Sequence, residues 1–345
     1  MRKVLANDNN EIRKKKETIK MAKVKNFKTI FPAVSVPLND DYSINEPEFR
    51  AYLRWIKTFY GKGMDGLVCN GHTGEITGLT RAERKRVVEI CAEECGDVMT
   101  IISGVNCENT AESIEMAKEA KEAGADGILL MPPHMWLRFG MNPDAPFEYV
   151  KDVAEEADID IIIHLYPATS KAFYPVETLI KMCKEIDHVK CIKMGTRVTS
   201  IYEHDVRLLR QECPDISLIT CHDETLCVSW FPGMDGALIG FAGCVPEIIC
   251  PAREVFANPD KHTLKEAQDW SDRIYHISQA IYGGGQPSGE AHARLKEALK
   301  QRGIFKSALM RKPVLPLNQE EKDWVALGLE RSQLPEVDMT QFEDK

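Results

Sequence analysis

Long hydrophobic runs are absent from this chain of 345 residues. Its apolar stretches are interrupted by Lys, Asp or Gly within about eight positions, whereas a membrane helix needs roughly 18 consecutive apolar residues. Glycine and proline number only 22 and 18, which excludes collagen-like and low-complexity proteins. With 43% hydrophobic and 28% charged residues, the composition predicts a soluble globular protein.

The sequence also lacks the apolar segment that follows the first charges of a secretory signal peptide. Its 11 cysteines are odd in number and widely spaced, so they do not form a disulfide framework. We therefore expect reduced thiols and a cytoplasmic protein. Cys91 and Cys95, four apart on a predicted helix, are either buried thiols or a metal pair. Without a second CxxC or a His pair nearby, we predict no metal site.

Positive charge is in deficit, since 44 basic residues face 53 acidic ones and the net charge is −9. This balance disfavours nucleic acid as a partner. Residues 1–28 differ, with ten basic against three acidic side chains. Their run Arg13 to Lys16 fits either a nucleic-acid or membrane arm or a solvated tail, and the missing aromatics and apolar face favour the tail. We predict a flexible basic extension over 1–28, with no nucleic-acid or membrane partner.

From residue 29 onward, short apolar runs alternate with amphipathic stretches of helical spacing. The runs are rich in consecutive Ile, Val and Leu, as expected for parallel strands that are covered on both faces. Eight such units in succession predict a (β/α)8 TIM barrel over residues 29–245. The predicted strands lie in the runs Thr29 to Leu38, Gly66 to Gly71, Thr100 to Val105, Gly127 to Pro133, Asp160 to Pro167, Val189 to Gly195, Ile216 to Asp223 and Gly236 to Phe241.

Helical signals fill the intervals between these runs and continue beyond them. Thr80 and Glu83 form a capping-box pattern at the start of one predicted helix. Residues 246–345 show helical segments and no strand signal, so we expect a C-terminal helical region devoted to packing or subunit contacts. Its predicted helices are Pro246 to Phe256, His262 to Ile281, Ser288 to Arg302 and Gln319 to Leu329.

Three features at predicted strand ends point to chemistry, because TIM-barrel sites lie at the carboxyl ends of the strands. Lys193 falls on the interior side of its strand, where it is either a desolvated nucleophilic amine or a lysine that reaches solvent or pairs with a buried carboxylate. Tyr166 ends the preceding strand and is either a proton shuttle or a core tyrosine. The stretch Asn70 to Glu75 carries two glycines and Thr73, which allow backbone amides to approach an anion.

The order of these features resembles the dihydrodipicolinate synthase and N-acetylneuraminate lyase family, over roughly residues 29–330. The family motif Gly-Thr-Thr-Gly-Glu appears as Gly71-His72-Thr73-Gly74-Glu75. The strand-five tyrosine matches Tyr166, and the strand-six Ile-Lys matches Ile192-Lys193. The segment that ends at Gly240 is similar to the family's eighth strand.

This resemblance implies a Schiff-base (class I) lyase that acts on 2-oxo acids, by aldol cleavage or condensation or by hydration or dehydration. Lys193 condenses with the ketone of pyruvate, and Tyr166 relays protons. Thr73, with Gly74 and the neighbouring amides, holds the carboxylate. No metal or other cofactor is implied, and the partners are a 2-oxo acid and an aldehyde. Family members also suggest a homotetramer or a homodimer.

Several residues depart from the synthases of lysine biosynthesis and indicate a different second substrate. His72 and His134 replace a threonine and a tyrosine of the synthase proton relay, so we expect that relay to be broken. The arginine that follows the synthase tyrosine is missing, with Lys171 as a partial substitute. The pair Met135-Trp136 is similar to the hydratase-aldolase branch, and Trp136 is expected to pack against an aromatic substrate.

Cys221 and His222 follow the seventh strand and are expected at the mouth of the site. His222 and His72 are each either a ligand for a substrate oxygen or a structural histidine. Two alternatives to the leading function remain: a dihydrodipicolinate synthase that uses aspartate semialdehyde, and a barrel without catalytic activity.

Overall fold

The eight predicted strands form one parallel sheet in the computed structural model, which describes residues 23–283 and 288–344. Neighbouring strands pair in the order β1-β8-β7-β6-β5-β4-β3-β2, and an isolated bridge from Ala33 to Val68 joins the first and last of these. The TIM barrel and the predicted strand positions are confirmed. The strands are β1 Ile30–Pro32, β2 Gly66–Cys69, β3 Thr100–Val105, β4 Gly127–Leu130, β5 Asp160–His164, β6 Val189–Met194, β7 Ser217–Thr220 and β8 Gly236–Ile239.

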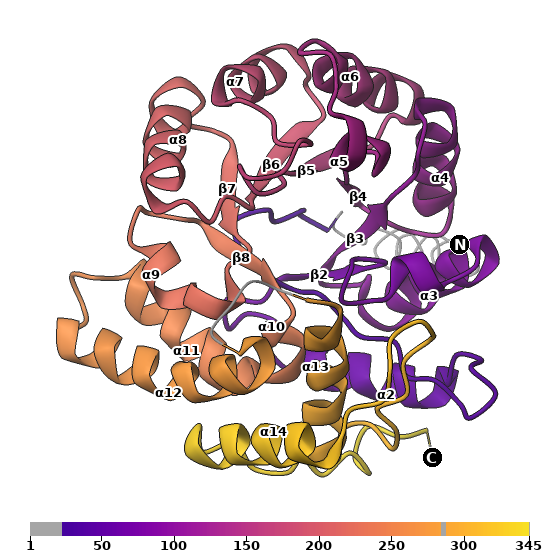
Figure 1. Cartoon of the computed structure of the whole chain (residues 1–345), viewed down its shortest axis with the longest axis vertical. Coiled ribbons are helices and arrows are strands. Elements are labelled where there is room, and N and C mark those ends of the chain that lie inside the picture. The colour runs from indigo at the N-terminus through magenta and orange to yellow at the C-terminus, as the bar shows by residue number, and fades with distance from the viewer. Residues whose placement is uncertain (1–22, 284–287, 345) are drawn as a thin grey trace, which may run out of the picture.

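Helices surround the barrel and follow its strands in sequence (Figure 1). The capping box of Thr80 and Glu83 is confirmed at the start of α3. Between β1 and β8 the helices are α2 Glu46–Lys57, η1 Ile76–Gly78, α3 Arg81–Cys95, α4 Thr110–Glu122, α5 Met135–Phe139, α6 Ala145–Ala157, α7 Val176–Glu185, α8 Thr199–Glu212, η2 Asp223–Thr225 and α9 Leu226–Trp230.

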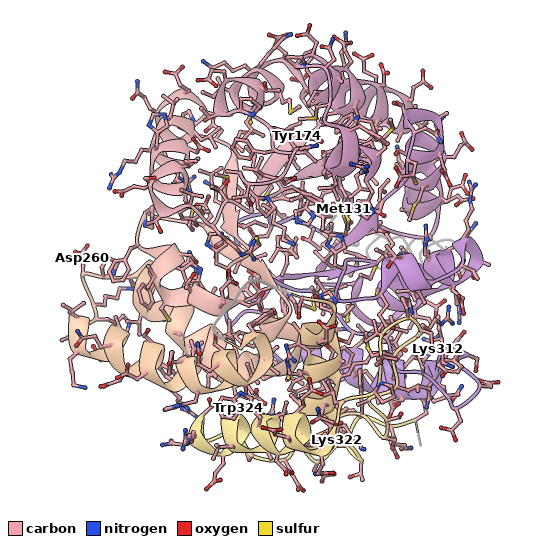
Figure 2. All side chains as sticks on the ribbon, in the orientation of Figure 1. Met131, Tyr174, Asp260, Lys312, Lys322 and Trp324 are labelled. Atoms are coloured by element: carbon pink, nitrogen blue, oxygen red, sulfur yellow. The ribbon has the colours of Figure 1, made fainter. Side chains whose placement is uncertain are left out.

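The described chain after β8 contains helices and no strands, as predicted. Figure 1 shows α12, α13 and α14 gathered at one side of the barrel. In Figure 2, Met131 lies within the barrel ring, while Lys322 and Trp324 lie on α14 at the margin of the molecule. These helices are α10 Phe241–Cys244, α11 Pro246–Ala257, α12 Leu264–Tyr282, α13 Gly289–Gln301 and α14 Gln319–Arg331.

One apolar side chain from each strand fills the inside of the barrel. These side chains fill the middle of the barrel, so water is excluded there. A site can form only where polar residues follow the strand ends. Cys191 belongs to this apolar set, so the side of β6 that also carries Lys193 faces inward, as the alternation predicts. The eight residues are Phe31, Val68, Ile102, Leu129, Ile162, Cys191, Ile219 and Leu238.

Residues 23–28 cover the amino-terminal end of the barrel, which corrects the prediction of a flexible extension for this part. Lys23 donates to the carbonyl oxygens of Gly96 and Met99, at 3.1 and 2.8 Å, and pairs with Asp126. Phe27 packs against the interior set. The segment therefore belongs to the barrel, and the chemistry is left to the opposite end. Residues 1–22 lie outside the described part of the chain.

Candidate active site

A cavity of about 420 Å³ opens at the carboxyl ends of the strands. It brings together most of the side chains that the sequence singled out, although they come from six different strand ends or loops. Residues from the C-terminal region also line it, which corrects the expectation that this region only packs. The predicted residues at the cavity are Lys193, Tyr166, His72, Thr73, His134, Cys221 and Gly240.

Lys193 projects from the end of β6 into this cavity. Within the described ranges, its ammonium has no carboxylate at ion-pair distance, so neither the surface nor the paired alternative holds. Burial lowers the pKa of Lys193 below its ordinary 10.5, and the positive charge of Arg197 acts in the same direction. A larger fraction of the amine is therefore neutral near physiological pH than for a surface lysine, and the neutral amine is the nucleophile.

Tyr166 is buried beside two imidazoles. Its hydroxyl lies 3.2 Å from Nε2 of His134 and 3.3 Å from Nε2 of His72. Nε2 of His134 also lies 3.1 Å from Nδ2 of Asn106. An unprotonated Nε2 has a single lone pair, so Asn106 and Tyr166 are alternative donors to His134, and the hydroxyl of Tyr166 can also accept from Nε2 of His72. The two replacements that we expected to break the relay instead hold imidazoles within hydrogen-bond reach of the same phenol.

Two further histidines were missed by the sequence analysis. His164, at the end of β5, is in register with Lys193, and its ring packs edge-on against Tyr166 with the centroids 4.9 Å apart. The sequence signal that could have identified His164 is a histidine at an interior position of an otherwise apolar strand. His292 reaches the cavity from α13, and no strand-end pattern announced it.

These imidazoles are held in their neutral form. Burial lowers the pKa of His72 to about 3 and of His292 to about 4, and Lys193 adds to both shifts. The pKa of His164 also lies well below its usual 6.5, again mainly because of burial. At neutral pH these rings therefore offer uncharged donors and acceptors, which suits proton transfer and hydrogen bonding more than charge neutralisation.

Two charged side chains at the cavity were also missed, although both follow strand ends directly. Arg197 follows β6, and its Nε donates to Oε1 of Glu224 at 2.5 Å. Asp223 follows β7 and accepts from the backbone nitrogen of Phe241 at 2.8 Å. Burial raises the pKa of Asp223 to about 7, so its carboxyl is partly protonated at neutral pH.

A buried ion pair between Glu75 and Lys296 anchors the loop after β2. Thr73 lines the cavity, while Gly74 does not, and a Cβ at Gly74 would lie 3.0 Å from the carbonyl oxygen of Val34. Glu75 adopts a left-handed φ of 56° and pairs with Lys296 of α13, whose side chain is only 1% exposed. The loop that carries Thr73 is therefore fixed to the C-terminal region.

Three predicted side chains, Trp136, Lys171 and His222, do not line this cavity. Trp136 packs edge-on against Tyr149 and Tyr174, with centroids 5.7 and 6.2 Å away, and Leu137 lines the cavity in its place. Lys171 is exposed and donates to the carbonyl oxygen of Arg138 at 3.1 Å.

His222 lines a second cavity of about 510 Å³ on the outer side of Arg197. Its ring packs against Tyr202, with the centroids 4.9 Å apart. Burial lowers the pKa of His222 to about 3. Its contacts with the core fit the structural alternative, whereas His72 takes part in the hydrogen bonds around Tyr166.

Cys91 and Cys95 are buried free thiols on α3. In the part of the chain that the structure describes, no group of three or more His, Cys, Asp or Glu side chains is arranged to hold a metal ion. No helix among those residues is long and apolar enough to cross a membrane.

Lys193 and Tyr166 lie at the ends of adjacent strands of the barrel. A comparison with known protein families gives a match that includes both residues. Residues 26–331 match the dihydrodipicolinate synthetase family. The chain belongs to this family. The dihydrodipicolinate synthetase family comprises lyases, and the protein is accordingly a lyase of the class I pyruvate-dependent aldolase type.

Individual relatives extend over nearly the whole described barrel. The chain is 26% identical over 310 residues to the 4-hydroxy-tetrahydrodipicolinate synthase of Bartonella bacilliformis, covering 89% of this chain and 99% of that protein. It is 30% identical over 294 residues to an uncharacterised DapA-like lyase of Pyrococcus horikoshii, covering 84% and 95%.

Among solved structures, the family member YagE of E. coli K12, crystallised in complex with pyruvate, matches with a TM-score of 0.80 and 21% identity. The match covers 89% of this chain and 99% of that one. At this identity the likeness supports the barrel fold only.

Proposed function

We propose that the protein forms a Schiff base between Lys193 and the ketone of a 2-oxo acid such as pyruvate, and uses it to make or break a bond at C3. The observation that carries the proposal is the amine of Lys193, which is half-buried at the cavity without a carboxylate partner among the described residues. An isolated, desolvated amine of this kind is the nucleophile that imine chemistry requires.

In the proposed reaction, the neutral amine attacks C2 of the 2-oxo acid and gives a carbinolamine. Loss of water then gives an iminium, which draws electrons from C3 and allows a C3 proton to leave. The resulting enamine attacks the carbonyl carbon of an aldehyde, and hydrolysis of the new iminium releases the product and restores the amine. In the reverse direction, the same steps cleave the bond.

The groups around Lys193 support these steps. Tyr166 has His72 on one side and His134 on the other, so its hydroxyl can give a proton to the departing water and recover one. We assign the binding of the 2-oxo acid's carboxylate to Thr73 and the amides of the loop after β2, because this loop lines the cavity. Uncharged His164 and His292 complete the wall and can bond to substrate oxygen atoms.

The test is intact-protein mass spectrometry after incubation with pyruvate and borohydride. A reduced pyruvate imine adds about 72 Da. We expect this gain for the wild type and for Lys190→Ala, because Lys190 is exposed on the same strand. We expect no gain for Lys193→Ala. A wild type that stays unmodified, or a modified Lys193→Ala, would refute the proposal, and the first result would favour a barrel without activity.

A dihydrodipicolinate synthase activity with aspartate semialdehyde is the second candidate. The hydrogen bonds from Tyr166 to two neighbours favour it, because they retain a relay geometry. The Bartonella relative is named for this activity. Turnover of pyruvate with aspartate semialdehyde tests it directly. The aromatic hydratase-aldolase alternative has less support, because Trp136 lies outside the cavity.

A further inference from the structure

The catalytic cavity carries more positive charge than a 2-oxo acid alone requires. Lys193 keeps a positive charge as an iminium, and the carboxylate of pyruvate balances it. Arg197 is a second cation at the wall. Among the described residues that line the cavity, Asp223 is the only carboxyl group, and burial raises its pKa to about 7. Glu224 offsets the charge of Arg197 from outside this cavity, so a ligand carboxylate inside the cavity is the complementary partner for the donors of Arg197 that Glu224 leaves open.

The hydrogen bonds of Arg197 leave part of its guanidinium for a ligand. Nε is held by Glu224, and Nη1 donates to the carbonyl oxygen of Gly195 at 3.2 Å. Over residues 23–283 and 288–344, Nη2 has no hydrogen-bond acceptor. The Arg197 side chain is only 14% exposed and lines the cavity, so this open donor is available to a ligand with little competition from bulk water.

Glu224 holds the guanidinium of Arg197 from the side of the second cavity. Arg197 lines both cavities, whereas Glu224 lines only the outer one. The ion pair therefore orients the guanidinium while leaving another part of it towards the catalytic cavity. A guanidinium in a fixed orientation matches the two oxygens of a carboxylate better than a flexible ammonium does.

We propose that the second substrate, the aldehyde, carries a carboxylate and that Arg197 binds it. This inference rests on the proposed Schiff-base function and names the class of its second substrate. Lys171, which the sequence offered as a partial substitute for the missing synthase arginine, is exposed and donates to a backbone carbonyl. Arg197 approaches instead from the loop after β6, four residues beyond Lys193.

Matched aldehydes test the proposal with pyruvate as the donor. One pair is 4-oxobutanoate and 4-oxobutanamide, and the other is 4-carboxybenzaldehyde and 4-carbamoylbenzaldehyde. Each amide keeps the shape of its carboxylate and removes the charge. For at least one pair, we expect kcat/KM of the wild type to favour the carboxylate by about tenfold or more. Arg197→Met should reduce that ratio to about one.

Arg207→Met is the matched control, because Arg207 lines only the outer cavity and pairs with Glu203 on the surface. It should keep the wild-type ratio. Arg197→Met leaves Glu224 without its partner, so Arg197→Met/Glu224→Gln serves if the single variant folds poorly. A wild type that prefers the amides or treats both members alike would overturn the proposal. So would an Arg197→Met that retains the preference.

A binding measurement separates this proposal from the proposed function. If pyruvate and borohydride leave no adduct, the Schiff-base function fails, whereas the anion site is still testable by calorimetric titration of benzoate and benzamide. The same titration decides the matter if an adduct forms but none of the aldehydes is turned over. We expect benzoate to bind about tenfold more tightly than benzamide to the wild type, and equally to Arg197→Met. Equal binding to the wild type would refute the anion site.

Discussion

The proposed role of Tyr166 in proton transfer depends on its hydroxyl, which lies within hydrogen-bond distance of His72 and His134. Tyr166→Phe keeps the ring and removes the hydroxyl. Because loss of water from the carbinolamine then lacks its proton donor, we expect the rate of imine trapping with pyruvate to fall by about 100-fold or more. Time-resolved mass spectrometry measures this rate. Tyr275→Phe, on the exposed face of α12, is the control, and an unchanged rate in Tyr166→Phe would exclude the role.

The pH dependence of imine formation reports the charge around Lys193. Only the neutral amine reacts, so the rate rises with pH and levels off above the pKa of Lys193, which burial holds below 10.5. The carboxylate of Asp223 favours the ammonium form. Asp223→Asn removes that charge and lowers the pKa further, so the rise should move to lower pH.

The measurement is the initial rate of reductive trapping with pyruvate and cyanoborohydride from neutral to alkaline pH. Asp215→Asn, an exposed position before β7, should leave the profile in place. A profile that stays unchanged or moves to higher pH in Asp223→Asn would show that the carboxyl group does not act on Lys193.

The sequence predicted the cavity position of several residues that lie at or just after a strand end. Lys193 and Tyr166 interrupt apolar runs at the end where a barrel builds its site, and the family motif supports both. Trp136 shows the limit of this reasoning. It lies on α5, a helix of five residues, and the rotation of so short a helix is set by packing, which placed Leu137 in the cavity and Trp136 against other aromatic rings.

At the scale of elements, α13 has two functions. His292 lines the cavity, and Lys296, four residues later and therefore on the same helix face, pairs with Glu75 below the loop that carries Thr73. Lys296 also donates to the carbonyl oxygen of Leu309 at 2.9 Å. The helix thus supplies one wall of the site and supports the loop on another wall.

Removal of one partner of this buried pair should be strongly destabilising. Lys296→Met leaves the carboxylate of Glu75 buried without its counter-ion, and we expect a loss of about 3–5 kcal/mol. The double variant Lys296→Met/Glu75→Gln should recover part of the loss, because no charge is then isolated. Denaturant unfolding followed by circular dichroism measures both. Lys300→Met on the exposed end of α13 is the control, and equal stability of Lys296→Met and the control would exclude the role.

The elements themselves were predictable because buried parallel strands leave runs of Ile, Val and Leu in the sequence, and amphipathic helices leave a period of 3.6 residues. The contribution of α13 to the site was not predictable in this way. Its amphipathic pattern indicates a packed helix, but the direction in which it crosses the barrel depends on tertiary contacts such as Leu295 against Gly240.

At the scale of the whole molecule, segment 23–28 is a second case in which the sequence pattern did not predict tertiary contacts. Its lysines indicated a solvated tail, yet two of them pair with acidic residues of the barrel, Lys23 with Asp126 and Lys25 with Asp160, the latter at 2.7 Å. Composition reports charge but not the presence of a partner far along the chain. Long-range pairs of this kind need the folded structure to be seen.

A comparison of two shortened chains measures what this segment contributes. A chain that begins at Met21 keeps the contacts of Lys23 and Phe27, whereas one that begins at Thr29 loses them. We expect the shorter chain to be less stable by about 2–5 kcal/mol, from a lost partly buried ion pair and the uncovered apolar end of the barrel. Thermal unfolding of both chains measures the difference, and identical midpoints would contradict the role of the segment.

The position of α13 near the end of the chain has a consequence for biosynthesis. A ribosome has translated all eight strands, and with them Lys193, well before it reaches His292 and Lys296. Until that point the nascent chain lacks one wall of the cavity and the support of the loop after β2. A partly made chain therefore has the lysine but lacks the cavity wall and the loop support that α13 provides.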